Sequence, residues 1–131
     1  MPQSASALND EKLVLDTIAT YLKALQKGDK SLFHEAFAET ANVSHCSIAD
    51  EKIAVSTLPK FLELVDDLHK SSGGRVEEFH TDPIVAVTGP VASVHVPFVL
   101  KLGSEEFTGT DVFALARIDG SWKITSKLYS M

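Results

Sequence analysis

The spacing of apolar residues changes near Gly73 and Gly74, and this change limits the possible folds more than any other feature. Before it, apolar residues recur every three or four positions, the period of an α-helix with one buried face. After it, they alternate or form short runs between turn residues, as in β-strands. A chain with its helices first and its strands last is typical of an α+β fold, in which the helices cover one face of a sheet.

Three helices are predicted in the first half of the chain. The first begins near Asp10 and ends at Gly28, because glycine readily adopts the left-handed conformation that closes a helix. A second, shorter helix is capped by Asp29, and its apolar face extends to Phe37. Thr57 caps a third amphipathic helix, which ends at the Ser-Ser-Gly-Gly run. We therefore expect one domain over residues 10–131, preceded by a flexible segment over residues 1–9.

The strands are predicted as a hairpin between residues 41 and 55, followed by strands from Val76 onward. The last four, over residues 84–87, 91–102, 107–118 and 122–129, are joined by short turns into an antiparallel meander. Asp119-Gly120 is the strongest two-residue hairpin signal. Pro83 and Pro97 cannot donate hydrogen bonds to a neighbouring strand, so each is expected at an edge, bulge or bend. The sheet should therefore be bent around the helices, with a pocket between them.

Composition argues against several classes of partner. The chain has 12 basic and 18 acidic residues and a formal net charge of −6, so its field repels phosphate backbones and anionic lipids. No apolar run approaches the roughly 18 residues that a membrane-spanning helix needs. Cys46 is the only cysteine, which rules out an internal disulfide and is compatible with a reducing compartment. We expect a cytoplasmic protein that binds neither nucleic acid nor membrane.

Two sets of residues carry a resemblance to known proteins. The first lies in the first two predicted helices: Tyr21, Gly28, Asp29, Leu32 and Phe37. The second lies near the C-terminus: Phe107, Thr108, Asp111, Leu115, the run from Asp119 to Ile124, and Lys127. With the order of elements, the first set resembles the nuclear-transport-factor-2-like superfamily, which includes SnoaL-like proteins. The second set resembles its family described as putative lumazine-binding.

The resemblance implies a strongly curved antiparallel sheet packed against three N-terminal helices, forming a cone with an internal pocket. Relatives in this superfamily include ketosteroid isomerases, scytalone dehydratases, polyketide cyclases, limonene epoxide hydrolases and many pocket-bearing proteins of unknown role. One fold thus supports several chemistries, so function has to be argued from the residues of the site.

The comparison with ketosteroid isomerases assigns catalytic candidates. Tyr21 matches the tyrosine that donates to the developing oxyanion, His45 occupies the position of the carboxylate base, and Ala114 replaces the second acid. Histidine can act as a base near neutral pH, and a tyrosine hydroxyl can polarise a carbonyl or enolate. The alternative is that Tyr21 is a core residue with its hydroxyl at the rim, and His45 a half-buried structural residue.

Further side chains are expected to line the pocket: His80, Phe37, Phe61, Val96, Phe98, Ala114 and Tyr129. By strand alternation His80 shares a face with Glu78, and this face could point either into the pocket or into solvent. His95 and Asp111 are expected on the opposite, convex face, and Lys127 on the face of Tyr129. None of the five histidines has the spacing of a zinc site, so we predict no metal, and no cofactor.

Three functional hypotheses remain open at this point. The first is a pocket protein for an apolar or aromatic ligand whose carbonyl or hydroxyl reaches Tyr21 and His45. The second is a cofactor-independent isomerase, dehydratase or cyclase that uses the same two residues. The third is a dimeric interaction module, which predicts no accessible cavity. A homodimer through the convex sheet face is expected in any case, because a single domain would leave Phe113, Leu115 and Val99 exposed.

Overall fold

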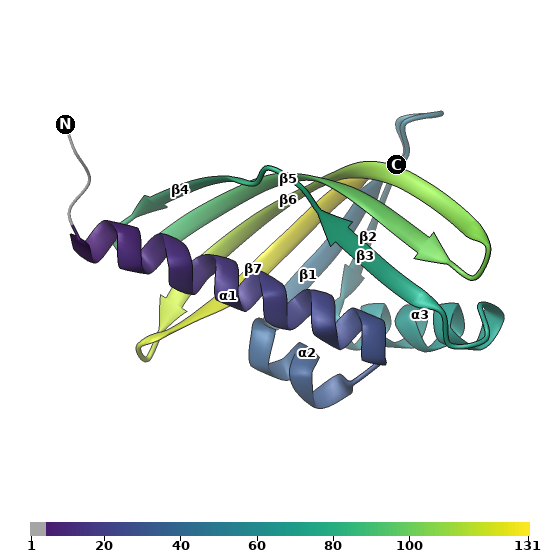
Figure 1. Cartoon of the computed structure of the whole chain (residues 1–131), viewed down its shortest axis with the longest axis horizontal. Coiled ribbons are helices and arrows are strands. Elements are labelled where there is room, and N and C mark those ends of the chain that lie inside the picture. Colours follow the sequence, from purple (N-terminus) through teal and green to yellow (C-terminus); the bar gives the residue numbers. More distant parts are fainter. Residues whose placement is uncertain (1–4) are drawn as a thin grey trace.

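The computed structural model describes residues 5–131 (Figure 1). It contains three helices and one curved, seven-stranded sheet, with the helices on one side of the sheet. The elements in chain order are α1 (Ala5–Lys27), α2 (Lys30–Ala36), β1 (Phe37–Cys46), β2 (Ile53–Thr57), α3 (Leu58–Ser71), β3 (Val76–His80), β4 (Ile84–Thr88), β5 (Val91–Leu102), β6 (Glu105–Ile118) and β7 (Ser121–Ser130). The α+β class expected from the change of period is confirmed.

The helix boundaries follow local signals, with two differences. Gly28 has a φ of 64° and ends α1 as predicted, and the Thr57 hydroxyl accepts a hydrogen bond from the backbone N–H of Lys60 at 3.3 Å. However, α1 already begins at Ala5, because the alanine-rich segment before Asp10 favours a helix. The other difference is that α2 ends at Ala36, so Phe37 starts β1 instead of belonging to the helix. Residues 1–4 lie outside the described residues.

The strand order is β2-β1-β7-β6-β5-β3, with β4 also paired to β5. Every pair is antiparallel except β1 and β7, which run parallel. The prediction of a curved antiparallel sheet is therefore confirmed for the hairpin and the meander but missed this pair. Parallel partners lie far apart in sequence, and no short turn signals their contact.

The two prolines mark the place where the sheet bends. β4 pairs with Val91–His95 of β5, and β3 pairs with Phe98–Leu102 of the same strand. Pro97 lies between these two stretches, where the partner of β5 changes and a backbone N–H is not needed. Pro83 lies in the break between β3 and β4. Both prolines thus occupy the bend predicted for them.

The core fills the space between the helices and the sheet. Tyr21 of α1 is fully buried and makes edge-on ring contacts with Phe33, Phe37 and Phe113, with ring centroids 5.7–6.2 Å apart. Phe113 and Leu115 belong to this core, so the expectation that a single domain leaves them exposed is wrong. Within residues 5–131, none of the helices has the length and apolarity needed to cross a membrane.

Candidate functional site

A bulge in β7 brings Lys127 into the interior. Ala114 of β6 pairs with Ser126, whereas the next residue of β6, Leu115, pairs with Ile124, so Thr125 is an extra residue in β7. Side chains alternate between the faces of a strand, and one extra residue exchanges the two faces beyond it. The inward residues therefore change from Trp122 and Ile124 to Lys127 and Tyr129. The Lys127 side chain is consequently only 5% exposed.

A cavity of about 210 Å3 lies between the sheet, α1 and α3. Most of its wall is apolar, and the polar groups of Tyr21, Glu78, Lys127 and Tyr129 also line it. Leu64 of α3 lines the cavity and is 43% exposed, which places it at the opening. The remaining lining residues are Leu25, Phe61, Val65, Leu68, Phe98, Leu100, Leu102 and Met131. Two larger hollows, of about 380 and 540 Å3, are open to solvent and contain none of the buried charged side chains.

Lys127 is held by aromatic rings and by hydrogen-bonding groups. Its Nζ donates to the Tyr21 hydroxyl at 2.7 Å and lies 3.6 Å from Asp111 Oδ1. It also lies 4.5 Å, 4.9 Å and 5.6 Å from the ring centroids of Tyr129, Tyr21 and Phe61. Burial alone would lower the pKa of Lys127, but the carboxylate of Asp111 and its other neighbours raise it well above its usual value. The lysine is therefore a fixed cation at the inner wall of the cavity.

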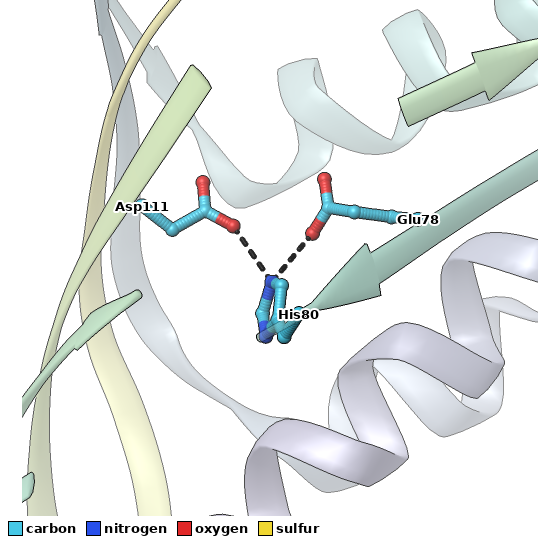
Figure 2. Close-up of side chains that lie close together, drawn as sticks. All are labelled: Glu78, His80 and Asp111. Atoms are coloured by element: carbon cyan, nitrogen blue, oxygen red, sulfur yellow. Dashed lines mark hydrogen bonds and ion pairs between the residues drawn. The ribbon is translucent and has the colours of Figure 1, made fainter. Parts of the chain in front are cut away.

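Glu78, His80 and Asp111 form a buried triad (Figure 2). Asp111 Oδ1 is the triad atom that lies 3.6 Å from the ammonium of Lys127. The His80 Nε2 donates to Glu78 Oε2 and to Asp111 Oδ2, each at 2.9 Å. Burial opposes protonation of His80, but the hydrogen bonds to the two carboxylates outweigh it and raise the His80 pKa to about 9. His80 is therefore a cation at neutral pH.

The two carboxylates of the triad differ in their proton affinity. Burial raises the pKa of Glu78, which lines the cavity. The pKa of Asp111 is lowered, because Lys127 and His80 outweigh the effect of its burial. Asp111 is thus an anion between two cations, whereas burial makes Glu78 hold its proton more readily than Asp111 does. Among residues 5–131, Asp111 Oδ1 has no hydrogen-bond partner.

The triad also has the donor types of a metal site. One ligand atom from each residue lies within 4.8 Å of the others. A divalent cation there would have to replace the proton on His80 and tolerate the ammonium of Lys127, 3.6 Å from Asp111. With His80 protonated, the two cations and two carboxylates balance, so the cluster is neutral without an ion. The sequence-based expectation of no metal stays a prediction.

The structure separates the two catalytic candidates chosen from sequence. Tyr21 lines the cavity, whereas His45 is not among the lining residues. His45 pairs with Tyr129 across β1 and β7, and the two rings stack at 4.7 Å. Its Nε2 has no hydrogen-bond partner within the described part of the chain. Tyr129 thus lies where His45 was expected, on the cavity wall.

The other predicted lining residues divide into four groups. Phe61, Phe98 and Tyr129 line the cavity, while Phe37 and Val96 are buried in the core beside it. His80 faces inward but reaches the cavity only through Glu78.

The fourth group is Ala114 on β6, where the prediction was wrong. Ala114 is exposed on the outer face, and Asp111 is fully buried, the reverse of the expected phase. The bulk of Phe113 and Leu115, which share the face of Asp111, was the available signal for the correct phase. His95 lies on the outer face, as expected.

Comparisons with known proteins support the fold. The family model described as putative lumazine-binding matches residues 9–130. No curated protein matches. The solved structures of low identity include a nuclear-transport-factor-2-like protein of unknown function from Shewanella baltica, with 17% identity, a TM-score of 0.73 and coverage of 98% of this chain and 96% of that one.

Two further structures resemble the chain in fold. One is a nuclear-transport-factor-2-like protein with a cystatin-like fold from Novosphingobium aromaticivorans, with 16% identity, a TM-score of 0.73 and coverage of 96% and 84%. The other is a protein of unknown function with a cystatin-like fold from Nostoc punctiforme, with 13% identity, a TM-score of 0.74 and coverage of 99% and 94%. Because the family model spans nearly the whole chain, this protein belongs to the putative lumazine-binding family, and its fold is that of nuclear-transport-factor-2-like proteins.

Proposed function

We propose that this protein binds a small, mainly apolar or aromatic molecule in the cavity, with a carbonyl or hydroxyl group against Tyr21 and Lys127. The observation that carries this proposal is the buried ammonium of Lys127 on the wall of an otherwise mostly apolar cavity. Burying a charge is costly, and a hydrophobic side chain of similar volume would often be as stable. A ligand that accepts a hydrogen bond from the Lys127 ammonium would explain why a charged residue occupies this position.

The volume of the cavity limits the size of the ligand. An engineered apolar protein cavity of about 150 Å3 binds benzene. The present cavity, at about 210 Å3, has room for one ring or for two small fused rings. Such a ligand would contact Phe61 and Phe98 on the wall. The name of the family adds one specific ring system to the candidates, lumazine.

The binding proposal can be tested by blocking the opening of the cavity. Leu64→Trp places a bulky side chain at the opening, and Leu13→Trp is the matched control, because Leu13 is 39% exposed and lies on the 380 Å3 hollow instead. We expect lumazine or another aromatic carbonyl compound to raise the melting temperature of the wild type and of Leu13→Trp, but not of Leu64→Trp. If these compounds raise the melting temperature of all three proteins equally, they bind outside this cavity and the proposal is contradicted.

A second candidate function, a cofactor-independent lyase or isomerase, is favoured by Glu78. Its carboxyl group lines the cavity and its pKa is raised by burial, which suits a general base working closer to neutral pH. The Tyr21 hydroxyl accepts from Lys127, so its own hydrogen is left to polarise a carbonyl. This proposal gives the role of base to Glu78 in place of His45.

Proton abstraction can be measured without knowing the substrate. Cyclic aromatic ketones incubated with the protein in D2O should exchange the hydrogen next to the carbonyl, as followed by NMR. We expect Glu78→Gln to abolish the exchange, and Glu77→Gln, its neighbour on the same strand, to retain it. Equal exchange in both variants would exclude Glu78 as the base.

We also propose that two copies pair through the outer face of the sheet. Three adjacent cross-strand rows on this face contain no Asp, Glu, Lys or Arg, although 23% of the chain is charged. The central row runs across six strands and consists of Ile84, His95, Val112, Leu128, Ser44 and Val55. The flanking rows consist of Pro97, Thr110, Ser130, Cys46 and Ile53, and of Ala86, Ser93, Ala114, Ser126, Asn42 and Thr57. A surface this large without charges favours association with a like surface.

Sedimentation at micromolar concentration tests this pairing. Val112→Lys should give a monomer, whereas Leu13→Lys should remain a dimer. Leu13 and Val112 are each 39% exposed, but only Val112 lies on the outer face of the sheet. A wild type that sediments only as a monomer would contradict the pairing.

A further inference from the structure

The polar side of the cavity presents two opposite charges to any occupant. Lys127 and Glu78 both line the cavity, and each affects the other electrostatically. Lys127 uses one N–H for the Tyr21 hydroxyl, and Glu78 uses Oε2 for His80. An ammonium has three donors and a carboxylate two oxygens, so each group has hydrogen-bonding capacity left. In Figure 2 the second oxygen of Glu78 points away from His80.

We infer that the cavity selects a neutral, planar ring with a carbonyl next to a ring N–H, as in a lactam or cyclic imide. This inference rests on the proposed function and specifies its ligand class. The carbonyl accepts from Lys127 or Tyr21, and the neighbouring N–H donates to Glu78. Both groups lie on one edge of such a ring. In an aromatic lactam the other edges are apolar or aromatic, as the wall formed by Phe61 and Phe98 requires.

Charged ligands fit this arrangement less well. A carboxylate would pair with Lys127 but repel Glu78, and an ammonium would pair with Glu78 but repel Lys127. A simple ketone would satisfy only the donor and leave the buried carboxylate without a partner on the cavity side, which costs about 1–3 kcal/mol. Discrimination by unpaired buried groups is stronger than discrimination by shape alone. A donor and an acceptor side by side on the ligand satisfy both charges at once.

A series of ligands of nearly equal size tests the inference by calorimetry. It consists of 2-quinolinone, N-methyl-2-quinolinone, naphthalene, 2-naphthoate and 1-naphthylmethylammonium. We expect 2-quinolinone to bind at least about tenfold more tightly than its N-methyl derivative, because a hydrogen bond to a charged group is worth about 1.5–3 kcal/mol. Glu78→Leu should remove this difference, and Glu77→Leu, on the same strand but outside the cavity, should preserve it.

The outcomes separate the inference from the proposed function. Equal affinity for 2-quinolinone and its N-methyl derivative, or tightest binding of the naphthoate or the ammonium, would overturn the ligand class while leaving a binding cavity. Binding of none of the five would overturn the cavity proposal as well. The comparison between the two quinolinones needs only the wild type, so it holds even if Glu78→Leu does not fold.

Discussion

The histidine at the centre of the triad should make the stability of this protein depend on pH between 6.5 and 9. The His80 pKa is raised from 6.5 to about 9 in the folded protein, because both carboxylates bind its protonated form. Below pH 6.5 the folded and unfolded chains are both protonated, so the stabilisation is fully present. Between pH 6.5 and 9 the unfolded chain loses the proton first, and the stabilisation is lost progressively.

The size of this effect follows from the pKa values. At about 1.4 kcal/mol per pKa unit, the change from 6.5 to about 9 sets a ceiling of roughly 3 kcal/mol. The His80 side chain is 9% exposed, so solvent screens the interaction little. The pKa of Glu78 is also raised, so the contribution of Glu78 to stability declines from pH 4.5 upward. Because the two groups titrate together, the stabilisation that belongs to His80 alone is smaller than this ceiling. A loss of about 2–3 kcal/mol is therefore expected.

Urea denaturation at pH 6.5 and pH 9, for the wild type and His80→Gln, measures the effect. Glutamine can still donate to the carboxylates but carries no charge, so the variant should be less stable at pH 6.5 and should lose much less stability on going to pH 9. NMR titration of the His80 ring in the wild type gives its pKa directly and does not depend on the variant folding. Equal pH dependence in the two proteins, or a His80 pKa near 6.5, would refute the reasoning.

Three further substitutions test the packing around the site by chemical denaturation. Lys127→Met should cost about 3–5 kcal/mol, because it leaves two buried carboxylates with His80 as their only cation. The exposed Lys101→Met should change stability by less than about 0.5 kcal/mol, and equal effects would contradict the buried position of Lys127. Gly109→Ala should cost about 3 kcal/mol or more, since its Cβ would lie 2.1 Å from the Ser130 carbonyl oxygen and 2.6 Å from the Phe98 ring, and a neutral result would mean that β6 and β7 separate easily. Thr57→Ala should cost about 1 kcal/mol by removing the cap of α3, and Thr57→Ser should retain most of it.

The sequence by itself determined the features that depend on neighbouring residues. The change from helical to strand period placed the helices before the sheet, and Thr57 capped α3 as predicted. Asp119 and Gly120 form the expected tight turn, with φ angles of 50° and 82°. These features could be predicted because caps, turns and hydrophobic periods are set by interactions within a few residues. Tyr21, by contrast, was chosen from its match to the tyrosine of ketosteroid isomerases, and the structure places it on the cavity wall.

Only the tertiary structure decided which charged groups meet in the interior. Lys127 faces inward because of the bulge at Thr125, and a single extra residue in one strand exchanges its two faces. Asp111 points into the interior because its face of β6 is the buried one. It contacts His80 because only β5 lies between β6 and β3 in the sheet. His45 stacks on Tyr129 through the parallel pairing of β1 with β7. Register and strand order bring together residues that are distant along the chain, so local sequence patterns could not predict these contacts.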